Sequence, residues 1–142
     1  MVREKVLFVC IGNMCRSRMA EGLLAHFGAE RFESHSCGVM GSGDSRHAIK
    51  AQQKLGIDAS EQWSKSWREV RDLKPDYVIF LDEYAKQQIP AFPGAGEVLD
   101  WFVDDPIETI GKEEEIQRVY DDTRDRIARL INEYFKLEIP LG

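Results

Sequence analysis

Long apolar segments are missing from this chain of 142 residues. No run approaches the ~20 apolar residues that a membrane span requires. Residues 1–5 precede an apolar run that is too short for a signal peptide and lacks a small-residue cleavage site. We therefore expect no membrane partner and a cytoplasmic location, and the length fits a single domain over residues 1–142.

The chain has only three cysteines and no excess of basic charge. Cys10, Cys15 and Cys37 form no C-x-x-C pair and no zinc ligand set with the three scattered histidines. Because their number is odd, a disulfide framework is not expected, and reactive thiols become the more interesting reading. The net charge of −6 argues against nucleic acid as a partner, since phosphate backbones favour basic surfaces.

Predicted strands and helices alternate along the chain. Apolar runs predict buried strands at 5–9 and 77–81, and weaker patterns predict strands at 32–37 and 98–103. Helical periodicity predicts helices at 17–28, 48–55, 65–73, 82–88 and 113–134. Such alternation implies right-handed β-α-β crossovers. We expect an α/β fold, a single-domain open parallel sheet of about four strands with helices on both faces.

Residues 10–17, Cys-Ile-Gly-Asn-Met-Cys-Arg-Ser, lead from the first predicted strand into the first predicted helix. This turn lies at the carboxyl edge of the sheet, where open α/β sheets bind ligands. Backbone N–H groups of such a turn converge on one point, and the helix dipole adds positive potential there. Arg16 can donate two parallel hydrogen bonds to two oxygens of a phosphate. The residues expected to bind a phosphate are Ile11, Gly12, Asn13, Met14, Cys15, Arg16 and Ser17.

The field that binds an anion also favours the thiolate of Cys10, which would be both a nucleophile and a good leaving group. Gly12 allows close approach of the backbone, and Asn13 tolerates a left-handed conformation. Ser17 either caps the helix or hydrogen-bonds the Cys10 sulfur. The simpler alternative is that Cys10 only fills the core and that Arg16 follows by chance, but the flanking strand, glycine, serine and helix favour chemistry.

A longer stretch resembles the signature of the low-molecular-weight protein tyrosine phosphatases. The resemblance includes residues 9–17, followed by Met19-Ala20-Glu21, and extends through Ser36-Cys37-Gly38, Gly56-Ile57-Asp58 and Asp105-Pro106. It covers most of the chain. The family implies roles for five residues: nucleophile for Cys10, phosphate clamp for Arg16, thiolate stabiliser for Ser17, loop support for Asn13 and a protective disulfide with Cys10 for Cys15.

Asp105 is the expected general acid, because a departing alkoxide or phenoxide needs a proton donor. It follows a predicted strand, and Pro106 restricts its backbone. The alternative reading is an ordinary acidic turn, for which Asp-Pro is common. The Asp-Pro acid of the family favours the catalytic reading, and Asp104 is the weaker candidate.

Several features resemble a sister branch of the fold, the thioredoxin-coupled arsenate reductases. Arg18 replaces a proline of typical phosphatases, and Ile107 and Glu108 replace aromatic residues that often follow Asp-Pro. The 39–47 loop is shorter than in eukaryotic phosphatases, and a tryptophan at position 101 precedes the Asp-Asp-Pro. That branch, however, relays a disulfide through two further cysteines. Here Asp82 stands where the first is expected, and no cysteine follows Cys37.

The sequence therefore predicts a phosphatase that forms a cysteinyl-phosphate intermediate on a phosphotyrosine protein or a small aryl phosphate. The alternative is an arsenate reductase that uses glutathione or mycothiol in place of an internal relay. A third possibility is a module that binds anions without turnover. No metal or other cofactor is expected, since the loop and Arg16 supply the positive charge, and no oligomeric state is implied.

Overall fold

Four parallel strands form the centre of the protein in a computed structural model that describes residues 2–142. They run in the order β2-β1-β3-β4, with bounds β1 Glu4–Cys10, β2 Phe32–Gly38, β3 Tyr77–Phe80 and β4 Glu97–Asp100. All pairings are parallel, so the carboxyl ends share one edge of the sheet. The chain passes from β1 to β2 on one side and then crosses to β3 on the other. Such a switch opens a crevice beside the end of β1.

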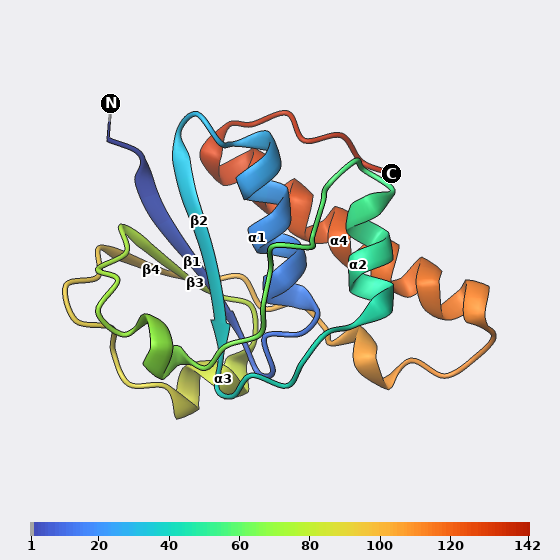
Figure 1. The fold of residues 1–142 in the computed structure, drawn as a ribbon, viewed down its shortest axis with the longest axis horizontal. Helices are drawn as coiled ribbons and strands as arrows, with labels where there is room; N and C mark the ends of the chain where they lie inside the picture. Colours follow the sequence, from blue (N-terminus) through green and yellow to red (C-terminus); the bar gives the residue numbers. More distant parts are fainter. Residues whose placement is uncertain (1) are drawn as a thin grey trace.

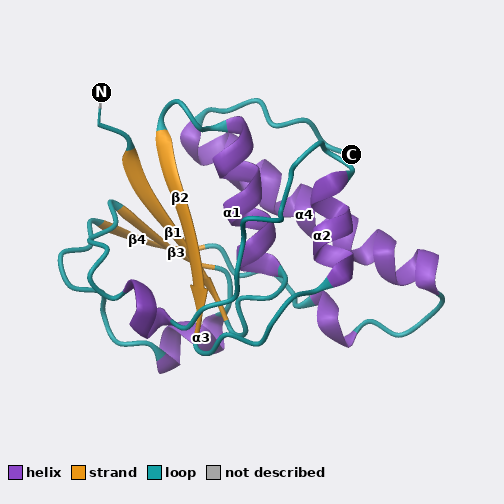
Figure 2. Ribbon diagram, viewed as in Figure 1, coloured by secondary structure: helices purple, strands orange, loops and turns teal. Residues whose placement is uncertain are grey.

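Helices cover both faces of this sheet. The α-helices are α1 Arg16–Phe27, α2 Arg46–Gln53, α3 Glu83–Gln88 and α4 Glu113–Phe135, with short 3-10 helices at Trp67–Val70 and Pro106–Glu108. Helices α1, α2 and α4 lie together on one side (Figure 1), while α3 lies on the other (Figure 2). The expected open parallel sheet with helices on both faces is therefore confirmed.

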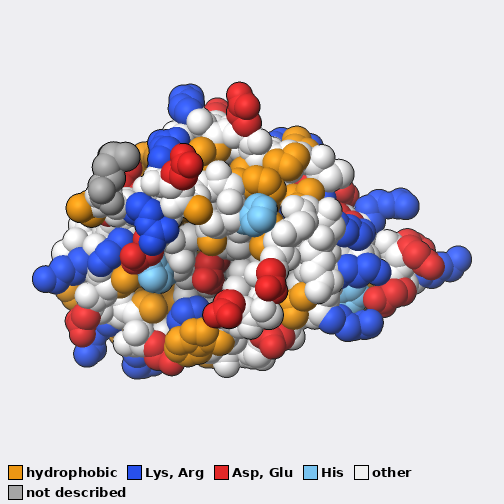
Figure 3. Space-filling model, turned by 45° about the horizontal axis from the view of Figure 1, so that its top comes forward, with side chains coloured by type: hydrophobic (Ala, Val, Ile, Leu, Met, Phe, Trp, Pro, Cys, Tyr) orange, Lys and Arg blue, Asp and Glu red, His pale blue; other side chains and the backbone are white. Residues whose placement is uncertain are grey.

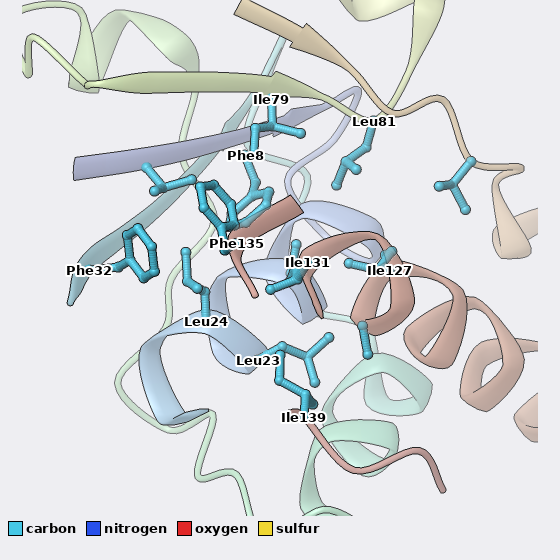
Figure 4. Close-up of a cluster of buried hydrophobic side chains, with 14 of the residues drawn as sticks. Phe8, Leu23, Leu24, Phe32, Ile79, Leu81, Ile127, Ile131, Phe135 and Ile139 are labelled. Carbon is cyan, nitrogen blue, oxygen red and sulfur yellow. The ribbon is translucent and has the colours of Figure 1, made fainter. Parts of the chain in front are cut away.

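β1 is buried from both sides because its side chains alternate between two apolar clusters. Val6 and Phe8 pack with α1 and α4, where Figure 4 shows Phe8 near Ile131. Leu7 and Val9 pack with α3 on the opposite face. Each fully buried side chain of this kind stabilises the fold by roughly 1.5–3 kcal/mol relative to exposure. The strand is thus firmly held where it ends at Cys10, the first residue of the phosphate loop (residues 10–17, the segment expected to bind phosphate).

Two predicted elements differ from the observed ones. The helix predicted at 65–73 is a loop that contains only the 3-10 helix Trp67–Val70. The Lys65 backbone is engaged elsewhere, because its N–H donates to Asn13 and its carbonyl accepts from Gly38. Tertiary hydrogen bonds therefore override the local helical preference. The fourth strand ends earlier than predicted, although Trp101 still bonds to the end of β3.

Within residues 2–142, no helix is long and apolar enough to cross a membrane. The longest helix, α4, begins with three glutamates, which suit the positive end of its dipole. On the face shown in Figure 3, acidic and basic side chains are interspersed. That face therefore carries no continuous basic surface of the kind that nucleic acid binding uses.

Candidate active site

Residues 10–17 curl from the end of β1 into the first turn of α1. Asn13 has a φ of 50°, a left-handed conformation that asparagine tolerates well. Cys15 is the N-cap of α1, and its side chain does not cap the helix. Within residues 2–142, no protein acceptor binds the backbone N–H groups of residues 12–15. These donors, beside a helix N-terminus, suit an anion.

The fully buried side chain of Asn13 ties this loop to two other segments. Its amide nitrogen donates to Ser17 Oγ at 2.9 Å and to Ser36 Oγ in β2 at 2.8 Å. Its carbonyl oxygen accepts from the Lys65 backbone N–H at 2.8 Å. The side chain therefore holds the left-handed backbone of Asn13 from three directions.

Cys10 is buried at the base of the loop, and its Sγ lies 2.9 Å from Ser17 Oγ. Because Ser17 Oγ already accepts from Asn13, its own proton is available to the sulfur. Of the two roles expected for Ser17, the structure places its hydroxyl against Cys10; the N-cap residue of α1 is Cys15, which makes no side-chain cap hydrogen bond. A hydrogen bond from this hydroxyl stabilises a thiolate.

Arg16 is buried and contacts the segments that follow β3 and β4. Its Nη1 donates to the carbonyls of Val103 at 2.7 Å and Leu81 at 3.3 Å. Two carboxylates flank the same guanidinium, with Asp82 Oδ2 3.0 Å from Nη1 and Asp105 Oδ2 3.2 Å from Nη2. The arginine is thus fixed in orientation at the carboxyl edge of the sheet.

The pairing of Asp82 with Arg16 is a contact that sequence analysis missed. The sequence predicts only that Asp82 starts a helix and that it stands where a relay cysteine would be expected. It does cap α3, since its Oδ1 accepts from the Ala85 N–H at 2.9 Å. Its position directly after a buried strand was the available signal, because the ends of parallel strands meet at one edge.

One cavity of about 220 Å³ brings the predicted residues together. Its lining consists of Cys10, Ile11, Gly12, Met14, Cys15, Arg16, Ser42, Asp105 and Ile107. Asn13 and Ser17 are buried behind it, and Ser42 is an addition that the sequence did not indicate. Asp104 is exposed and does not line the cavity, which favours Asp105 as the acid. Within residues 2–142, no cluster of His, Cys, Asp and Glu is placed to hold a metal ion.

The other two cysteines are buried neutral thiols. Cys15 contacts the Tyr120 hydroxyl at 3.8 Å, and burial raises the pKa of its thiol to about 11. Burial also raises the pKa of Cys37, which packs in the apolar cluster on the opposite face of the sheet. All three cysteines are free. Because Cys10 and Cys15 line the same cavity, their pairing under oxidants stays a prediction.

Cys15 should make the protein sensitive to alkaline pH. Its pKa rises from 9.0 to about 11 on folding, so the folded state keeps a proton that the unfolded state releases. The resulting stability is complete below about pH 9 and falls by about 2–3 kcal/mol as the pH approaches 11. Urea unfolding at pH 8 and pH 11 measures this loss, and Cys15→Ser should lose less. Equal losses in both proteins would contradict the assignment to Cys15.

Comparison with known proteins relates the whole chain to one family. A sequence profile described as low molecular weight phosphotyrosine protein phosphatase matches residues 5–138. An arsenate reductase of Halalkalibacterium halodurans is 34% identical over 134 residues, covering 94% of this chain and 96% of the relative. The arsenate reductase of Bacillus subtilis is 31% identical over a stretch of the same length and coverage.

Solved structures include both activities. An arsenate reductase in its oxidized state has a TM-score of 0.73 at 29% identity, covering 92% of this chain and 98% of that one. The tyrosine phosphatase Wzb from Escherichia coli K30, in complex with sulphate, has a TM-score of 0.71 at 20% identity, covering 93% and 99%. At that identity the likeness concerns the fold alone. Because the family profile matches residues 5–138, the chain belongs to the low molecular weight phosphotyrosine protein phosphatase family.

Proposed function

We propose that this protein is an arsenate reductase in which Cys10 attacks arsenate and an external low-molecular-weight thiol completes the reduction. The observation that carries the proposal is the likeness to arsenate reductases at 31–35% identity over nearly the whole chain. The external thiol follows from the end of β3, where Asp82 pairs with Arg16 and no cysteine beyond Cys37 exists to form a relay.

The chemistry begins with arsenate held by the loop N–H groups and Arg16. The Cys10 thiolate attacks arsenic, and one arsenate oxygen leaves as water after accepting protons. An external thiolate then attacks the Cys10 sulfur, and the electron pair of the sulfur–arsenic bond passes to arsenic, which leaves as arsenite. A second thiol cleaves the mixed disulfide on Cys10. Two thiols are thus oxidised to one disulfide for each arsenate reduced.

The contacts of Asp105 support a role as proton donor for the departing oxygen. Its Oδ2 lies 3.2 Å from Arg16 Nη2, and its carboxyl group lines the cavity that contains Cys10. Its other oxygen accepts from the Ile107 N–H at 3.0 Å, which fixes the direction of the carboxyl group. A carboxyl group oriented in this way can protonate an oxygen bound to arsenic or phosphorus.

The same position of Asp105 favours a second candidate function, the hydrolysis of a phosphotyrosine protein or a small aryl phosphate. In that reaction Cys10 displaces the phenoxide, Asp105 protonates it, and water releases phosphate from the cysteinyl-phosphate. Both reactions need a reduced thiol, which is compatible with the proposed cytoplasmic location.

A side-by-side assay tests the proposal. The reduced protein is given arsenate with glutathione or mycothiol, arsenate with thioredoxin and its reductase, or p-nitrophenyl phosphate. We expect arsenate-dependent thiol oxidation with a small thiol and none with thioredoxin alone, because no cysteine follows Cys37 to receive the disulfide.

Each other result has a distinct meaning. Turnover with thioredoxin alone would contradict the interpretation of Asp82. Hydrolysis of the aryl phosphate without arsenate reduction by any thiol would favour the phosphatase. Phosphate binding with neither activity would identify the protein as an anion-binding module.

A further inference from the structure

A second buried arginine, Arg18, lies behind the phosphate loop, where typical phosphatases of the family have a proline. It is 2% exposed. Its guanidinium donates through Nε to Gln62 at 3.3 Å, through Nη1 to the carbonyls of Asn13 at 3.3 Å and Gly43 at 3.5 Å, and through Nη2 to Asp44 at 2.9 Å. Burial of a charge is costly unless it is paired. So many partners indicate that this charge is firmly placed.

One of these bonds reaches the backbone of the phosphate loop. The Asn13 carbonyl accepts from Arg18 and also from Ser64 Oγ at 3.0 Å. In a trans peptide the carbonyl and the following N–H point in opposite directions. The N–H of Met14 therefore points away from the buried guanidinium. Met14 lines the cavity, and no acceptor within residues 2–142 binds its N–H.

The charges around the site indicate that Arg18 contributes to anion binding. Arg16 is flanked by two carboxylates, those of Asp82 and Asp105, which offset its attraction for an anion. Arg18 pairs with one carboxylate, Asp44, whose side chain is 63% exposed. Water and salt screen an exposed charge more strongly than a buried one. At the phosphate loop, the positive potential of the Arg18 guanidinium therefore exceeds the negative potential of Asp44.

We propose that Arg18 is a positioning residue of the oxyanion site. By holding the Asn13 carbonyl it orients the Met14 N–H, and its charge polarises that peptide and raises the affinity of the loop for a tetrahedral oxyanion. This inference rests on the proposed function only in that the loop binds such an anion. It holds for arsenate and phosphate alike.

Binding of inorganic phosphate to the reduced protein, measured by titration calorimetry, tests the role of the charge. Arg18→Gln should weaken binding by at least about tenfold, because a unit charge several ångströms away at an effective dielectric constant near 20 contributes more than that and Asp44 offsets part of it. Arg18→Lys keeps the charge and should recover most of the affinity. In turnover, Arg18→Gln should raise KM for arsenate more than it lowers kcat, since the interaction exists before the chemical step.

Asp44→Asn is the matched variant, and it is expected to act in the opposite direction. Asparagine still accepts a hydrogen bond from Arg18 but removes the compensating charge, so phosphate should bind about twofold to threefold more tightly. Thermal melting identifies any variant that fails to fold. If Arg18→Gln does not fold, tighter binding by Asp44→Asn supports the proposal, and unchanged or weaker binding overturns it.

Phosphate binding by the parent protein and by the variants distinguishes the function of the loop from the role of Arg18. Absence of phosphate binding by the parent protein would contradict the proposed function itself. Equal phosphate affinities for the parent and a folded Arg18→Gln variant would overturn only the role of Arg18. Weaker binding in both Arg18→Gln and Asp44→Asn would mean that the pair merely braces the loop, which also overturns the electrostatic role.

Discussion

Cys10→Ser is expected to abolish turnover of arsenate and of aryl phosphate, by about 10⁴-fold or more, because no other group in the cavity can replace the attacking sulfur. Cys15 lines the same cavity but is a neutral thiol at pH 7, since burial raises its pKa to about 11. Serine is close in size to cysteine, so the loop should keep its shape and its affinity for phosphate. Steady-state turnover and phosphate titration measure the two properties separately.

Cys37→Ala is the control for this experiment. Cys37 packs on the opposite face of the sheet from the apolar cluster of α1 and α4, so its removal should cost some stability and leave turnover intact. Substantial turnover by the Cys10→Ser variant would exclude covalent catalysis by Cys10. Loss of turnover together with loss of phosphate binding would instead indicate a collapsed loop.

Asp105→Asn is expected to slow turnover by about 10²–10⁴-fold where a basic oxygen must leave, because it removes the proton donor. Phenyl phosphate or phosphotyrosine should lose far more rate than p-nitrophenyl phosphate, whose leaving group departs readily without a proton. Asparagine retains an oxygen that can accept from Arg16, so the arginine should stay in place. Rates on a series of aryl phosphates measure the dependence on the leaving group.

Asp104→Asn is the matched control, since Asp104 is the exposed neighbour that does not line the cavity. It should behave almost like the parent protein. If Asp105→Asn slowed good and poor leaving groups equally, Asp105 would only shape the loop and orient Arg16. A leaving-group dependence in the Asp104 variant would move the acid one residue earlier.

The sequence by itself determined the class of fold and the position of the phosphate loop. The apolar run before Cys10 and the helical pattern after Ser17 are local signals, and the loop between them is continuous in the chain. Both sequence patterns match the structure, because helices on either side bury both faces of β1 and because α1 packs between the sheet and the helices α2 and α4. A contiguous strand, loop and helix can therefore be recognised without knowledge of the remaining structure.

The tertiary structure alone decided which distant residues meet at the phosphate loop. Arg16 and Asp105 are 89 positions apart, and they meet because the sheet order brings the ends of their segments to one edge. Lys65 reaches Asn13 through its backbone, in a segment whose local pattern predicted a helix. Local propensities carry no information about such pairs, because a contact across the fold depends on which strands become neighbours and which charges are buried together.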